Sequence, residues 1–143
     1  MRTSVLLTIS FVLWGADNTL LAQEPQLSKA EQAIVAHEVA KMKTSDERAI
    51  VNSWSNAKKV AEFICRPAAL RTLAKQDASI DKVFLGTNDP ASLTLESAGR
   101  LTGSGQYRKG IDWSEIDFTC EVNPDTGKVA SFQWVPAKNK AAQ

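Results

Sequence analysis

Hydrophobic and polar residues alternate most clearly between Asp112 and Val122. A period of two predicts a strand with one buried face and one solvated face. The Asn-Pro-Asp-Thr-Gly segment at 123–127 is typical of a turn, and a second apolar run extends from Val129 to Val135. These features predict a β-hairpin. The positions assigned to its buried face are Ile116, Phe118, Cys120 and Val122 on the first strand and Ala130, Phe132 and Trp134 on the second.

Three further strands are expected before this hairpin, at Asp81–Gly86, Ser92–Glu96 and Gly99–Lys109. The last one contains Gly103 and Gly105 in the middle of its alternating pattern. Glycine weakens a strand interior, so two of them indicate a bulge or a place where another surface approaches the backbone.

Helical periodicity dominates the first half of the chain. Ser28 followed by Glu31 forms a capping box, which predicts a helix over Ala30–Lys43. Glu31 and Glu38 interrupt its apolar stripe, so we expect it to pack at the periphery or to form a mobile arm. The residues before it, Gln23–Leu27, are expected to be a short disordered lead.

A second capping box at Thr44 and Glu47 predicts an amphipathic helix over Asp46–Ile64. We expect this helix to end near Cys65, because Pro67 disfavours helical geometry at the preceding residue. A short third helix, Ala68–Lys75, follows with Leu70 and Leu73 facing inward. The apolar stripe of the second helix is Ile50, Trp54, Ala57, Ala61 and Ile64.

Helices followed by strands are typical of the α+β class. We therefore expect N-terminal helices packed on a four- to five-stranded antiparallel β-meander. The predicted organisation is a signal peptide at 1–22, a peripheral N-terminal helix or arm at 23–44, a single α+β domain at 45–136 and a disordered tail at 137–143.

The signal-peptide assignment rests on Arg2, the apolar run Val5–Trp14 and the small residue Ala22 after Leu20 and Leu21. The run is shorter than the roughly 20 residues that span a bilayer. An uncleaved amphipathic anchor is the alternative. Export to the periplasm or secretion is the expectation, with no transmembrane segment once the signal is removed.

Cys65 and Cys120 are the two cysteines of the chain. An even pair in an oxidising compartment favours one disulfide, and two isolated buried thiols are the alternative. Closing such a loop would stabilise the fold by about 4 kcal/mol in the chain-entropy model. The spacing is not that of a C-x-x-C redox motif, and a structural zinc site would need more ligands.

The net charge and the sequence motifs limit the classes of function that fit this chain. The chain has 17 Lys and Arg against 16 Asp and Glu, a net charge of +1, which predicts neither nucleic acid nor an anionic membrane as a general partner. We find no G-x-S-x-G elbow, P-loop or H-E-x-x-H motif. The single histidine, His37, lies in the first predicted helix and is interpreted as a surface residue. No cofactor and no metal site is predicted.

Two clusters remain as candidate sites. The acidic positions Asp112, Glu115, Asp117 and Glu121 suggest a hydrolase pair or a calcium site, although the solvated face of an amphipathic strand explains them more simply. Basic and aromatic residues near Arg100, Gln106 and Lys109 suggest binding of a polyanion, a glycan or a protein. The candidate contact surface is Tyr107, Arg108 and Trp113; the alternative is that Trp113 stacks on Arg108 and stabilises the sheet, while Trp54 and Trp134 belong to the core.

Several segments resemble the DUF930-like family of small exported alphaproteobacterial proteins of unknown function. The resemblance extends from about Trp54 to Trp134 and implies export and a two-cysteine unit of helix and sheet, without any activity. The matching landmarks are Ala61-Glu62-Phe63-Ile64-Cys65-Arg66-Pro67, Leu101-Thr102-Gly103-Ser104-Gly105-Gln106-Tyr107-Arg108, Trp113 through Phe118, Cys120, Gly127-Lys128-Val129 and Phe132.

These observations favour an exported, non-enzymatic binding module of the bacterial envelope, whose partner is an envelope protein or a cell-wall component. The alternative function is a small enzyme that processes an envelope polysaccharide or another ligand at a shallow acidic site. That alternative requires Asp112, Glu115 or Asp117 to converge with a second acidic strand.

Overall fold

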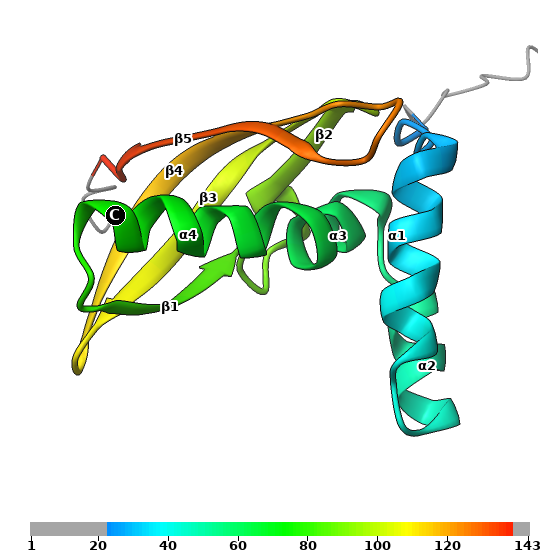
Figure 1. Ribbon diagram of the computed structural model, residues 1–143, viewed down its shortest axis with the longest axis horizontal. Coiled ribbons are helices and arrows are strands. Elements are labelled where there is room, and N and C mark those ends of the chain that lie inside the picture. The colour runs from blue at the N-terminus through cyan, green and yellow to red at the C-terminus, as the bar shows by residue number, and fades with distance from the viewer. Residues whose placement is uncertain (1–22, 139–143) are drawn as a thin grey trace, which may run out of the picture.

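The computed structural model describes residues 23–138, so the predicted signal peptide at 1–22 and the tail residues 139–143 lie outside the described part. The described chain is an α+β domain in which helices precede a five-stranded antiparallel sheet (Figure 1). Its helices are α1 (Lys29–Ala40), α2 (Ser45–Asn52), α3 (Asn56–Val60), the π-helical turn η1 (Ala61–Cys65), α4 (Arg66–Gln76) and the 3₁₀ turn η2 (Pro90–Ser92). Its strands are β1 (Ile80–Leu85), β2 (Leu93–Ser97), β3 (Arg100–Lys109), β4 (Asp112–Val122) and β5 (Val129–Pro136).

The sheet has the order β1-β3-β4-β5, and β2 also pairs with β3. Strands β1 and β2 lie against successive parts of β3, because Leu85 is opposite Gly105 and Leu93 is opposite Gly103. The two short strands therefore form one sheet edge that residues 86–92 interrupt. Strands β2 to β5 follow the predicted meander, whereas β1 lies in line with β2.

The glycines of β3 allow this arrangement. A Cβ atom added to Gly105 would lie 2.5 Å from the carbonyl oxygen of Phe84, and one added to Gly103 would collide with the carbonyl oxygen of Ser92. The expected close approach at these glycines is confirmed, and the approaching surface is the backbone of β1 and of the turn η2.

The helical layer differs from the prediction at two places. The second helix is not continuous, because α2 ends at Asn52 and α3 begins at Asn56, with the Ser55 side chain accepting a hydrogen bond from the Lys58 amide. Ser55 is therefore the N-cap of a new helix, although the hydrophobic stripe predicts a single helix across this position. The predicted stripe consequently loses its first two members: Ile50 is 60% exposed, and Trp54, predicted in the core, is half-buried in the break between the helices and outside the core cluster.

The predicted stop before Pro67 is wrong. Helical geometry continues from α3 through η1 into α4, and the Arg66 amide donates to the Ala61 carbonyl in the wider π pattern. Proline is tolerated in the first turn of a helix, and a π-helical turn relieves the conflict between its ring and the preceding backbone. The helical segment that covers the sheet is therefore longer than predicted, and Leu73 of α4 is fully buried.

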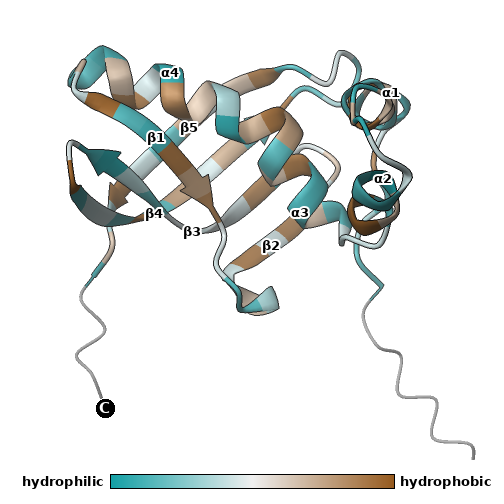
Figure 2. Ribbon diagram, turned by 90° about the horizontal axis from the view of Figure 1, so that it is seen from below, coloured by the Kyte–Doolittle hydropathy of each residue, from teal (hydrophilic) through white to brown (hydrophobic). Residues whose placement is uncertain are grey.

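A single core lies between this helical layer and the sheet. In Figure 2 the hydrophobic stretches of the strands lie where α3 and α4 cross them. A disulfide between Cys65 at the end of η1 and Cys120 of β4 crosses the core, with both residues fully buried. The largest fully buried hydrophobic side chains are Val60, Leu73, Val83, Leu85, Leu101 and Ile116.

The N-terminal segment is packed more closely than predicted. Glu24, expected in a disordered lead, accepts hydrogen bonds from the backbone amides of Asn56 (2.7 Å) and Ala57 (2.6 Å) at the start of α3, and Leu27 is buried. The capping box of α1 forms as predicted, since Ser28 and Glu31 exchange hydrogen bonds of 2.7 and 3.2 Å. Glu31, expected to dilute an apolar stripe, is itself fully buried.

The central hairpin follows the predicted alternation on β4, whose even-numbered residues from Ile116 to Val122 are buried. On β5, Phe132 and Trp134 face the core as expected, but Ala130 is exposed. The reason is a register shift, because Glu121 pairs with Ser131 while Val122 pairs with Val129. A β-bulge at this point turns Val129 toward the core in place of Ala130.

Candidate binding surface on the open sheet face

The helices cover one face of the sheet, and the other face, here called the open face, carries the candidate chemistry (Figure 1). Strand alternation decides which side chains project from it. On β4 they are Trp113, Glu115 and Asp117, because the intervening Ile116 and Phe118 are buried against the helices. The pairing of β4 with β3 places Arg108 and Gln106 beside them.

The predicted contact surface divides between the two faces. Arg108 lies opposite Trp113 in the β3–β4 ladder, and both project from the open face. Tyr107 is the next residue on β3, so it projects to the helical side, where its ring meets Trp134 edge to face at 5.7 Å. Trp134 thus packs against the core as predicted, and Tyr107 joins it there rather than the open face.

Phe84 of β1 completes the cluster on the open face. Its ring stacks on Trp113 with centroids 5.4 Å apart, and the Arg108 guanidinium lies 5.8 Å from the Trp113 centroid. Lys82 places its ammonium 5.1 Å from the Phe84 ring. The four side chains form a cation–aromatic stack across β1, β3 and β4, and Trp113 keeps 42% of its surface exposed. The contact between Trp113 and Arg108 is the sheet-stabilising arrangement that the sequence left open.

Nearby carboxylates balance the cations of this region. Arg108 donates two hydrogen bonds to Asp81, at 3.0 and 2.6 Å, and Lys109 donates one to Asp77 at 2.6 Å. The hydrogen bond from Arg108 lowers the pKa of Asp81, and the hydrogen bonds from Lys109 and Ser79 lower the pKa of Asp77. Arg100, the third basic residue singled out in the sequence, is paired with Glu96 and Glu121, so all three of these cations already have carboxylate partners.

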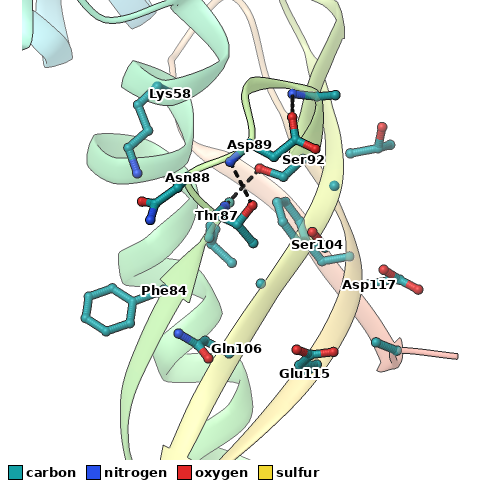
Figure 3. A pocket seen from close by; sticks show the side chains of 18 of the residues that line it. Lys58, Phe84, Thr87, Asn88, Asp89, Ser92, Ser104, Gln106, Glu115 and Asp117 are labelled. Carbon is teal, nitrogen blue, oxygen red and sulfur yellow. Dashed lines mark hydrogen bonds between the residues drawn. The ribbon is translucent and has the colours of Figure 1, made fainter. Parts of the chain in front are cut away.

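A hollow of about 1050 Å³ surrounds the break between β1 and β2, next to the aromatic stack. We call it the edge hollow. Figure 3 shows the loop residues at one end of it and Gln106, Glu115 and Asp117 at the other. Phe84 is shared between the stack and the hollow. The polar side chains that line it include Asn88, Ser92, Ser104, Gln106, Glu115 and Asp117.

The loop at 86–92 is held in place by its own hydrogen bonds (Figure 3). The Thr87 amide donates to the Ser92 hydroxyl at 2.8 Å, and the Asp89 amide donates to the Thr87 hydroxyl at 3.1 Å. The Gly86 amide donates to the Ser104 carbonyl at 2.7 Å, which attaches the loop to β3. These hydrogen bonds hold the loop in one conformation where it lines the edge hollow.

The acidic residues Glu115 and Asp117 project from the same face of β4, as the alternation predicts. Glu115 and Asp117 both line the edge hollow, whereas Asp112 lies at the far end of β4, opposite Lys109. Beside Asp117 the neighbouring strands place Ser104 and Val135, so they add no carboxylate to this position. The second acidic strand that the enzyme hypothesis requires is thus not supplied by the flanking strands.

Other candidate chemistry is equally limited within residues 23–138. No group of three or more His, Cys, Asp or Glu residues there is arranged to hold a metal ion. In the same range no helix has the length and apolar character needed to cross a membrane. His37 is exposed in the last turn of α1.

Phe84 and the loop at 86–92 are the parts of the surface that sequence reasoning missed. Phe84 lies between Val83 and Leu85 in a short apolar run, whose composition predicts a short buried strand. Both neighbours are buried, whereas the Phe84 ring turns to the open face. The signal that could have found Phe84 is the strand period of two, which places it on the face opposite to Val83 and Leu85.

Comparison with protein-family models, with curated proteins and with solved structures gave no match.

Proposed function

We propose that this protein is an exported, non-enzymatic binding module of the bacterial envelope that holds a cell-wall glycan on its open face. The observation that carries the proposal is the half-exposed Trp113, which stacks on Phe84, a residue that lines the edge hollow. An aromatic ring next to several fixed polar groups suits a ligand with both apolar ring faces and many hydroxyl groups.

The polar groups of the hollow favour an uncharged glycan over a polyanion. Gln106 and Asn88 offer amides, Ser104 offers a hydroxyl, and Glu115 and Asp117 accept hydrogen bonds from sugar hydroxyls. The same two carboxylates would repel an anionic polymer. Arg108 and Lys109 do not reverse this preference, because Asp81 and Asp77 already bind them.

Export is part of the proposal. A disulfide such as Cys65–Cys120 persists in oxidising compartments, which supports a periplasmic or secreted protein. The predicted signal peptide at 1–22 and the resemblance to DUF930-like exported proteins agree with that placement.

The test is a calorimetric titration of the purified protein with uncharged N-acetylhexosamine oligosaccharides of increasing length. We expect binding that strengthens with length until the oligosaccharide spans the stack and the hollow. Trp113→Ala should weaken that binding about tenfold, which corresponds to roughly 1.4 kcal/mol. An anionic polysaccharide of the same length should bind more weakly.

Two controls separate binding from folding. Gln106→Ala removes a polar group of the hollow and leaves both rings of the aromatic stack in place, so it should weaken binding even if Trp113→Ala destabilises the domain. Ile50→Ala alters an exposed side chain on α2, away from the open face, and should leave affinity unchanged. Equal affinity of all three variants for the oligosaccharides, or no binding by the wild type, would overturn the proposal.

A further inference from the structure

The two edges of the sheet differ in how they are protected. The edge formed by β1 and β2 is interrupted by the loop at 86–92, irregular at Asp81, and charged at Asp81, Lys82 and Glu96. Loops, bulges and charges are the features that prevent edge strands from pairing with another chain. The other edge is β5, which extends over 8 residues and contains no charged side chain.

The outward-facing backbone of β5 can be deduced from one hydrogen bond. The Ala137 amide donates to the Glu115 carbonyl, so this pair exchanges hydrogen bonds with β4. Such pairs alternate along an antiparallel ladder, so Val135, Gln133 and Ser131 also face β4. The amide and carbonyl groups of Trp134 and Phe132 consequently point away from the sheet. Among the described strands β5 pairs with β4 alone.

We propose that two copies of this chain pair through their β5 strands, antiparallel and with Phe132 opposite Phe132 of the second copy. In that register the outward-facing backbone of Phe132 meets the same residue of the second copy. Trp134 lies beside the bulged segment at Ala130, where a small side chain leaves room for it. Ser131 lies opposite Gln133, and no like charges meet, because β5 carries none.

This register also determines the shape of the dimer. Paired residues in an antiparallel ladder project to the same face of the sheet. The sheet therefore continues from one copy into the other, with both open faces on the same side. The pairing of β5 strands does not depend on the proposed glycan binding. If the protein both dimerises and binds a glycan, the dimer offers two edge hollows to one extended glycan, which raises the effective affinity of the dimer for that ligand.

The first test measures self-association of the chain, as purified from exporting cells, by sedimentation equilibrium. Wild type and the neutral variant Gln133→Thr should both dimerise. Gln133→Lys places two ammonium groups close together across the dyad and should weaken the dimer at least tenfold. Ile50→Lys adds the same charge at an exposed position on α2 and should dimerise like the wild type. A wild-type protein that is monomeric up to millimolar concentration would overturn the proposal, as would equal weakening by both lysines.

The second test checks the register by disulfide trapping. Ser131 and Gln133 of the second copy form a pair without mutual backbone hydrogen bonds, with Cα atoms about 4.5 Å apart, within reach of a disulfide. A mixture of the single variants Ser131→Cys and Gln133→Cys should cross-link under mild oxidation, and each variant alone should cross-link far less. Cross-linking of either variant with itself at the level of the mixture would overturn the proposed register.

Discussion

The sulfur atoms of Cys65 and Cys120 are bonded to each other, which joins the π-helical turn η1 to strand β4 across the core. The two residues are separated by 55 positions in the sequence, and their Cα atoms lie 6.2 Å apart. The bond connects the first half of the chain, which is helical, to the centre of the sheet. It fixes the helical layer over the strands that carry the open face on their other side.

Replacing both cysteines with alanine should lower the free energy of unfolding by about 4 kcal/mol, because the unfolded chain loses the constraint of the long closed loop. The loss is measured by denaturant unfolding of the Cys65→Ala/Cys120→Ala variant against the oxidised wild type. Wild type treated with reductant is the matched control, and it should lose a similar amount. A loss below about 1 kcal/mol would contradict the structural role of the bond.

Glu31 should respond differently to two substitutions. Its Oε2 atom accepts the Ser28 amide at 2.7 Å, while its fully buried Oε1 atom has no partner among the described residues. Glu31→Gln keeps an acceptor for the cap and removes a buried charge, so it should unfold at an equal or higher denaturant concentration. Glu31→Ala loses the cap and should cost about 1–2 kcal/mol. If glutamine destabilises as much as alanine, the carboxylate charge itself is required.

Two glycines with similar backbone angles provide a matched pair. Gly127 and Gly110 have φ values of +67° and +63°. A Cβ on Gly127 would lie 2.5 Å from Cδ1 of Ile34, whereas a Cβ on Gly110 would meet nothing within 4 Å. Gly110→Ala should therefore cost about 1 kcal/mol for its backbone conformation alone, and Gly127→Ala about 1–3 kcal/mol more. Equal thermal midpoints would show that α1 moves freely relative to the β4–β5 turn.

The pair of Asp77 and Lys109 should make stability depend on pH below about 4. The hydrogen bond from Lys109, reinforced by Ser79, holds the folded-state pKa of Asp77 below the unfolded value of about 3.9. The contribution of this carboxylate is therefore present above the unfolded pKa and is lost as the pH falls through the folded pKa. Unfolding midpoints measured from pH 6 to pH 2 should fall less steeply for Asp77→Asn than for wild type.

Lys109→Met removes the hydrogen-bond partner of Asp77 and should also reduce the pH dependence of the unfolding midpoint. This variant distinguishes the effect of the Asp77–Lys109 pair from a general effect of charge. Both ends of this pair are solvent-accessible, so salt should weaken the effect in wild type. An Asp77→Asn profile parallel to that of wild type over the whole range would contradict the assignment.

The elements whose signal is local can be predicted from the amino-acid sequence. Strand β4 has the predicted bounds, because its alternation of apolar and polar residues directly reflects the two faces of a sheet. The α1 capping box depends on residues three positions apart, and it forms as predicted. The α+β class and the disulfide followed from the order of these patterns and from an even cysteine count in a chain predicted to be exported.

Features that depend on contacts between distant segments could not be predicted in this way. Pro67 was expected to end a helix, but burial of Leu73 under the sheet favours continuing it, and a π-helical turn accommodates the ring. Glu24 finds its partners at the start of α3, more than thirty positions away. Tyr107 and Trp113 were grouped by proximity in the sequence, but the parity of the strands sends them to opposite faces. Phe84 reaches Trp113 only because β3 lies between their strands, a pairing that no local pattern contains.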